Sequence, residues 1–173
     1  MRMLKRPQPI NGIKELHFYG DYSCRQHEGY ANRLIKTFPN VSNMKITIQG
    51  LDSIVSIRHI CTKFSQLTKL TVDGEQYEGN HFENIGNVEE LHYVNTVAFS
   101  PSSENRVKRL ILDNVDVRRF LCVKVSFPQL KYLEIRSRRK TSEIISEHIA
   151  EIRRKFQNCV VHFVRIYDGY SVP

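Results

Sequence analysis

The sequence predicts an α/β domain, built as a short solenoid of parallel strands with helices and turns on the opposite face. Three observations lead to this prediction. One nine-residue pattern recurs six times along the 173 residues. Its copies begin at residues 10, 38, 64, 85, 104 and 127, at steps of 28, 26, 21, 19 and 23 residues. Several segments between the copies have helical spacing. A periodic unit of this length is typical of repeat proteins, and about six to seven repeats are expected.

The six copies share one order of apolar positions, φ-x-x-φ-x-φ, where φ is an apolar residue. Five of them also begin with an apolar residue, and only the copy at 104 lacks it. In chain order the copies read INGIKELHF (10–18), FPNVSNMKI (38–46), FSQLTKLTV (64–72), IGNVEELHY (85–93), ENRVKRLIL (104–112) and FPQLKYLEI (127–135).

The last two apolar positions of each copy alternate with polar ones, which places them on one face of a short strand. A single strand cannot bury that face, so parallel stacking of the copies must close a shared core. The leading apolar residue is expected to cap this core from the convex side. The inward pairs are Leu16/Phe18, Met44/Ile46, Leu70/Val72, Leu91/Tyr93, Leu110/Leu112 and Leu133/Ile135.

The pattern resembles the first part of the leucine-rich-repeat signature, over roughly residues 10–166. Its Phe-Pro-x-Leu phrasing and irregular lengths are most similar to the repeats that follow an F-box in ubiquitin-ligase adaptors, although the chain contains no F-box. The resemblance implies a substrate-recognition module. At the family's asparagine position the chain has other residues, so the usual asparagine ladder is expected to be missing. These residues are Asp21, Gln49, Glu75, Thr96, Val115 and Arg138.

The segments between and after the copies predict the remaining elements. Residues 30–37, 53–63 and 141–156 have helical spacing, and 159–166 reads as a final strand. The segments that follow the copies at 85 and 104 leave room only for turns or a single helical turn. Residues 1–9 and 167–173 are expected to be tails around a repeat domain of residues 10–166. The first tail is too short for a capping unit, so we expect a fragment, a truncated product or a first coil that docks on a partner.

Composition places the chain inside the cell, in the cytoplasm or nucleus. It is 40% apolar and 25% charged, as in ordinary soluble domains. No apolar run is long enough to cross a bilayer, and the first ten residues, MRMLKRPQPI, do not resemble a secretory signal. The four cysteines are far apart in sequence, which favours buried or half-buried thiols in a reducing compartment.

The net charge of +8 is unevenly distributed. Residues 73–104 hold seven acids and no Lys or Arg, whereas residues 106–165 hold fifteen Lys and Arg against six acids, a balance of +9. This distribution predicts a positive end beside a negative middle, which could steer a charged partner. A solvated surface that serves solubility is the alternative.

No motif for catalysis, metal binding or cofactor binding emerges from the sequence. The seven histidines are scattered, without zinc spacing, and no glycine-rich phosphate loop is present. Cys24 and His27 are close in sequence, but no orienting group or oxyanion site accompanies them. The sequence therefore predicts a non-catalytic protein with no cofactor, no metal and no small-molecule substrate.

A protein or peptide partner is expected on the concave strand face, at the side chains that alternate with the core. These positions form three columns with Tyr and Arg among them, the residue types enriched at protein-binding hot spots. The columns are Glu15, Asn43, Lys69, Glu90, Arg109, Tyr132; His17, Lys45, Thr71, His92, Ile111, Glu134; and Tyr19, Thr47, Asp73, Val94, Asp113, Arg136. The side chains expected to bind the partner are Lys69, Glu90, His92, Arg109, Tyr132, Glu134 and Arg136.

Nucleic-acid binding through the basic C-terminal half is the alternative function. Dense positive charge attracts phosphates, although no known nucleic-acid motif or stacking platform accompanies it. A nuclear-targeting signal or a solvated surface would explain the same residues. The residues in question are Arg136, Arg138, Arg139, Lys140, Arg153, Arg154 and Lys155.

Overall fold

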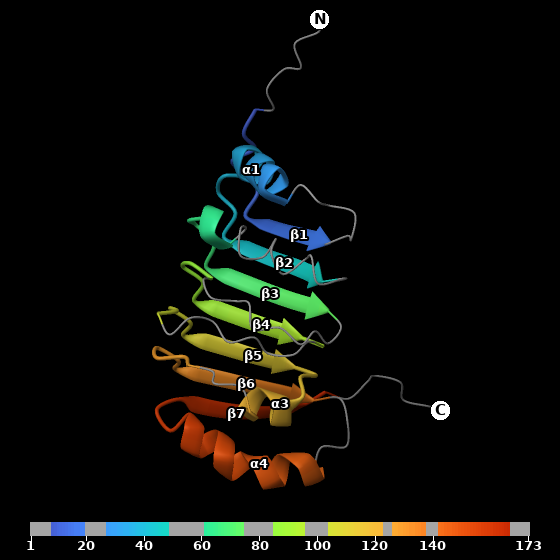
Figure 1. Cartoon of the computed structure of the whole chain (residues 1–173), viewed down its shortest axis with the longest axis vertical. Coiled ribbons are helices and arrows are strands. Elements are labelled where there is room, and N and C mark those ends of the chain that lie inside the picture. Colours follow the sequence, from blue (N-terminus) through green and yellow to red (C-terminus); the bar gives the residue numbers. More distant parts are fainter. Residues whose placement is uncertain are drawn as a thin grey trace, which may run out of the picture.

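The computed structural model describes residues 8–19, 27–48, 61–74, 85–95, 104–122, 126–137 and 142–166. These residues form one sheet of seven strands, whose spatial order β1-β2-β3-β4-β5-β6-β7 is the order of the chain. Every neighbouring pair is parallel. Figure 1 shows the strands stacked along the long axis of the molecule, with α1 near β1 and α4 near β7. The predicted α/β fold with a parallel sheet is confirmed, and the arrangement is compatible with a solenoid.

Each copy of the repeated pattern contributes one strand, and the predicted C-terminal segment adds the seventh. In chain order the elements are β1 (Glu15–Tyr19), α1 (His27–Thr37), β2 (Asn43–Ile48), β3 (Lys69–Gly74), β4 (Glu90–Val94), β5 (Arg109–Asp113), α3 (Val117–Cys122), β6 (Tyr132–Ser137), α4 (Ser142–Lys155) and β7 (Val160–Arg165).

The strand register stacks equivalent positions of the copies directly on one another. Leu16 is paired with Met44, and the same row continues through β7 to Val161. This row is fully or almost fully buried from Met44 to Leu133. The backbone repeats as well, because at the start of β2 to β6 two consecutive N–H groups donate to one carbonyl of the preceding coil. The accepting carbonyls are those of Lys14, Ser42, Thr68, Glu89 and Lys108.

The three described helices α1, α3 and α4 each place apolar side chains in or against the core. Leu34 of α1 packs against the core, and Ile152 of α4 is buried within it. The helix predicted at 53–63 is seen only at its end, residues 61–63, and its other residues lie outside the described ranges. After the copy at 104, α3 is longer than the single turn expected there. Its Phe120 stacks on Phe156 with ring centroids 5.8 Å apart, which joins α3 to the end of α4.

The first coil is less buried than those that follow it. Ile10 is 49% exposed and Ile13 37% exposed, whereas the equivalent Phe64 and Val41 are buried. The expectation that Ile10 caps the core is therefore wrong. The physical reason is position, because β1 is an edge strand with a neighbouring coil on one side only.

Amide side chains at the strand entries join successive coils. Asn40 donates to the Asn11 carbonyl at 3.1 Å, and Asn87 donates to the Ser65 carbonyl at 3.0 Å. Asn105 does the same toward Ser126, at 2.8 Å. These amides satisfy turn carbonyls that strand pairing leaves open.

Two further asparagines directly follow the C-terminal ends of β4 and β5. Each lies one residue before the position at which leucine-rich repeats usually have asparagine. Asn95 and Asn114 have positive φ angles of 52° and 54°, in the region that Asn tolerates better than most residues. The Asn114 side chain donates from Nδ2 to the side-chain oxygen Oδ1 of Asn95 at 2.7 Å. At the family position itself, Val115 packs against the core, and the other five positions lie outside the described residues.

The cysteines follow the prediction only in part. Cys61 is buried, and burial raises the pKa of its thiol to about 12. Cys159 is half-buried, but Cys122 at the end of α3 is exposed, contrary to the prediction. Cys24 lies outside the described residues. None of the helices in the described ranges is long and apolar enough to cross a bilayer.

Candidate functional site

The candidate site lies on the sheet face opposite the core, which we call the outer face. The register aligns the three predicted columns across β1 to β6, and β7 extends them with Val160, His162 and Val164. All seven side chains predicted to bind a partner belong to this face, on β3 to β6. The site is built from regular strands.

The N-terminal part of the site consists of ion pairs between neighbouring strands. Lys45 Nζ lies 2.8 Å from Asp73 Oδ2, and Lys69 Nζ lies 2.9 Å from Glu90 Oε1. Off the outer face, Lys108 Nζ is 2.7 Å from Glu89 Oε1. Acids of the predicted negative segment are thus paired with lysines that come before and after it in sequence. Within the described residues, these pairs offset much of the local negative charge.

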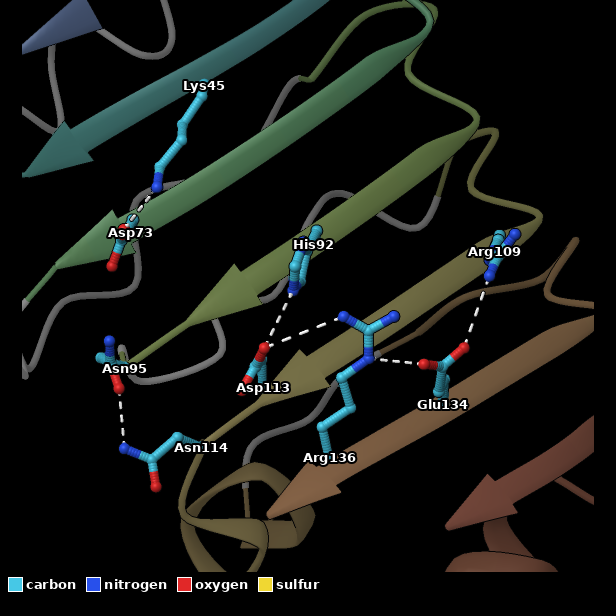
Figure 2. Close-up of polar contacts among 9 residues, drawn as sticks. All are labelled: Lys45, Asp73, His92, Asn95, Arg109, Asp113, Asn114, Glu134 and Arg136. Atoms are coloured by element: carbon cyan, nitrogen blue, oxygen red, sulfur yellow. Dashed lines mark hydrogen bonds and ion pairs between the residues drawn. The ribbon is translucent and has the colours of Figure 1, made fainter. Parts of the chain in front are cut away.

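Glu134 is the centre of the C-terminal part of the site (Figure 2). Its side chain is 8% exposed. The Tyr132 hydroxyl donates to Glu134 Oε2 at 3.0 Å, and Arg136 Nε donates to Oε1. Arg109 donates to Oε2 at 3.4 Å and lies over the Tyr132 ring, 4.8 Å from its centroid. One carboxylate therefore holds two guanidinium groups and a phenol in fixed positions.

These contacts also decide the ionisation of the cluster. Burial alone would raise the pKa of Glu134, but hydrogen bonds from Arg136, Tyr132 and Arg109 and the Arg136 charge lower it overall. The hydrogen bond to Glu134 raises the pKa of Tyr132. At neutral pH the centre is a carboxylate, and the phenol keeps its proton as the donor.

His92 and Asp113 lie on the same face, and their side chains are only 17% and 11% exposed. His92 Nε2 is 3.8 Å from Asp113 Oδ2, and Arg136 is 3.9 Å from the same oxygen. Among the described contacts, His92 Nε2 and Asp113 Oδ1 are buried without a hydrogen-bond partner. Figure 2 shows Asp113 lying between the imidazole and the Arg136 guanidinium. His92 is on the predicted face, with only a small part of its side chain exposed.

Acidification is expected to destabilise the protein through His92. Burial and the Arg136 charge lower its pKa below the usual 6.5, against the smaller opposing effects of Asp113 and Glu90. The unfolded chain therefore binds the proton more readily, and stability falls as the pH drops below about 6.5. Thermal unfolding at pH 7.5 and 5.5 should show a larger loss in the wild type than in His92→Gln. An equal loss in both proteins would contradict this assignment.

The described members of the basic set predicted to bind nucleic acid lie on different parts of the fold. Arg136 is held by Glu134 on the outer face, whereas α4 packs its Ile152 into the core on the other side of the sheet. Lys155 donates to the Leu121 carbonyl at 2.9 Å, while Arg153 and Arg154 are exposed. Arg138, Arg139 and Lys140 lie outside the described residues. The sheet therefore separates Arg136 from the basic end of α4.

Besides Lys45 and Asp73, three further outer-face residues of the site were not among those expected to bind a partner. Asp113 pairs with His92 and Arg136, as described above, and Ile111 is buried, with 4% of its surface exposed. The His162 ring lies 5.1 Å from the Tyr132 ring, centroid to centroid. Asp113 and Ile111 occupy outward columns in the sequence. His162 is in a strand without the repeated pattern, so only its register with Glu134 reveals its place.

Among the described residues, no group of three or more His, Cys, Asp and Glu side chains is arranged to hold a metal ion. Comparison with known proteins found no matching family model, no matching curated protein and no matching solved structure.

Proposed function

We propose that this chain is a leucine-rich-repeat type of interaction scaffold, which binds a protein or peptide across the outer face and catalyses no reaction. The repeated pattern and the coil-by-coil backbone bonds support the repeat type. By its resemblance to F-box/leucine-rich-repeat adaptors, the proposal extends to substrate recognition for a ubiquitin ligase.

The observation that carries this proposal is the cluster around Glu134. Arg109 and Tyr132 are residue types that dominate binding energy when they sit preordered at the centre of an interface. Here one buried carboxylate restrains both side chains before any partner arrives. A partner would therefore lose less side-chain entropy on binding them than on binding unrestrained surface side chains.

Site-specific photo-crosslinking tests the proposal. A benzophenone amino acid in place of Thr71, in the middle column of the outer face, should give discrete crosslinked products in cell extract. Adding Arg109→Ala and Tyr132→Ala should lower the yield by about tenfold, because hot-spot truncations weaken binding by at least that factor. Mass spectrometry then identifies the partner.

The matched control carries the crosslinker in place of Gln157, an exposed residue in the turn between α4 and β7, outside the outer-face columns. This position should give none of the Thr71 products. Equal products from both positions, or a yield that the double substitution leaves unchanged, would rule out an outer-face interaction. Circular dichroism of each variant verifies that the fold is retained.

Nucleic-acid binding is the second candidate function. It is supported by the exposed Arg153 and Arg154, which end α4 and have no acidic partner among the described contacts. An oligonucleotide arm of the binding experiment below tests it.

A further inference from the structure

The charges of the outer face are sorted by depth. In the pair of Arg109 with Glu134, the arginine side chain is 45% exposed and the glutamate 8%. For Lys69 and Glu90 the values are 44% and 26%. The Lys45–Asp73 and Arg136–Asp113 pairs have the same order. In all four pairs the cation lies toward solvent and the carboxylate lies beneath it.

This order holds for the pairs on β2 to β6 and not for every described ion pair. At the edge strand β1, His17 and Glu15 are 54% and 59% exposed, so the acid is no deeper than the base. Lys108 and Glu89 pair away from the outer face, and their side chains are 44% and 48% exposed. There the acid is as accessible as the base. On the outer face of β2 to β6, by contrast, an approaching ligand meets ammonium and guanidinium groups first.

The outer-face cations keep unused donors. An ammonium has three N–H groups and a guanidinium has five. Among the described contacts, Arg109 uses one N–H on Glu134, and Lys69 makes one ion pair with Glu90. A second carboxylate could bind each cation without displacing the first. The buried acids, in turn, hold the cations in place for it.

We propose that the outer face binds an acidic peptide segment in an extended conformation that crosses the strands. The proposal rests on the proposed function and names the chemistry of its partner. Carboxylates of the peptide pair with Lys45, Lys69 and Arg109, and the Arg109–Tyr132–Glu134 cluster holds one end of the segment. Peptide selectivity comes from charge-assisted hydrogen bonds, which are stronger than neutral ones.

Strand spacing sets the spacing of the acids. Lys69 and Arg109 occupy the same column on β3 and β5, two strand positions apart. Parallel strands are about 4.8 Å apart, so Lys69 and Arg109 are separated by about 10 Å along their column. A polyproline II peptide presents the same face every three residues, about 9 Å. An acidic residue at every third position therefore matches the two cations.

The acids that lie beneath the cations favour a peptide ligand over a nucleic acid, because they cancel the positive charge of these side chains. Each of the cations Lys45, Lys69, Arg109 and Arg136 is matched by its own acid, Asp73, Glu90, Glu134 or Asp113, so the eight side chains sum to no net charge. Nucleic-acid affinity follows net phosphate neutralisation and needs an excess of positive charge. A peptide with widely spaced carboxylates needs only the contacts of each carboxylate with a single cation.

Fluorescence anisotropy with labelled peptides tests the proposal. The probe is a peptide of repeated Glu-Pro-Pro triplets, and its control has Gln in place of every Glu. The test variant combines Lys45→Gln, Lys69→Gln and Arg109→Gln. The matched control variant combines Lys108→Gln, Arg153→Gln and Arg154→Gln, which removes the same charge elsewhere. A single-stranded oligouridine is measured in parallel, at low and high salt.

The acidic peptide should bind the wild type and the control variant alike, and bind the test variant about tenfold more weakly, because exposed ion pairs of about twofold to threefold each multiply. Equal binding of both peptides, or equal loss in both variants, overturns the proposal. The proposal is also overturned if oligouridine binds more tightly than the acidic peptide and this binding is lost in the control variant alone. That result would favour the nucleic-acid function. If neither peptide binds while the Thr71 crosslinks persist, this inference fails and the proposed function stands.

Discussion

Replacing Leu110 with alanine should lower the free energy of unfolding by about 3 kcal/mol. Leu110 is fully buried in the shared row, between Leu91 of β4 and Leu133 of β6. Coils on both sides hold the backbone in register, so the neighbouring side chains can collapse only partly into the space left behind. Urea unfolding followed by circular dichroism measures the loss.

Leu16→Ala is the matched control, because it deletes the same atoms from the same row at the edge strand. Leu16 is only half-buried, with a stacked neighbour, Met44, on one side. Its substitution should cost about 1 kcal/mol, since fewer contacts and less buried area are lost. Equal losses at both positions would contradict a row whose burial grows toward the middle of the sheet.

Replacing Gly86 with alanine should cost about 2 kcal/mol or more. Gly86 has φ +61°, a conformation that L-residues with a side chain rarely adopt. A Cβ there would lie 2.7 Å from the Cys61 carbonyl oxygen, which is backbone and cannot rotate away. Strain and steric clash therefore act together at the turn that leads into β4. The midpoint of thermal unfolding should fall by several degrees.

Gly12→Ala provides the control, because Gly12 occupies the turn of the first copy. A Cβ at Gly12 would have no atom within 4 Å. This substitution should change stability by less than about 0.5 kcal/mol. A loss at Gly12 that matches the loss at Gly86 would mean that the strained turn and its contact with Cys61 are not the cause.

The strands and their register could be predicted from the sequence because apolar and polar residues alternate in the same order in every copy of the pattern. A shift by one residue would turn every buried side chain of a strand to solvent. The copy that contains Leu70 and Val72 therefore cannot shift by one residue against its neighbours. Once the register is fixed, the outward columns follow, and with them the placement of Arg109, Tyr132 and Glu134 on one face.

The contacts within that face could not be predicted in the same way. The pairing of Arg136 with Glu134 and Asp113 depends on which rotamer each long side chain adopts, and the repeated pattern says nothing about rotamers. The depth of His92 depends on the long side chains around it. The exposure of Ile10 could have been foreseen, since an end coil lacks one neighbour. The role of His162 could not, because β7 carries no copy of the pattern.

The order of the strands has a consequence for how the chain is made. Each strand pairs only with strands adjacent in sequence, so no coil must wait for a distant segment before it can form. Such a chain can assemble progressively as it leaves the ribosome, and ordering can begin in any pair of coils and spread in both directions. With its exposed Ile10 and Ile13, the coil of β1 gains least from ordering before its neighbour. It becomes stable only after the second coil has packed against it.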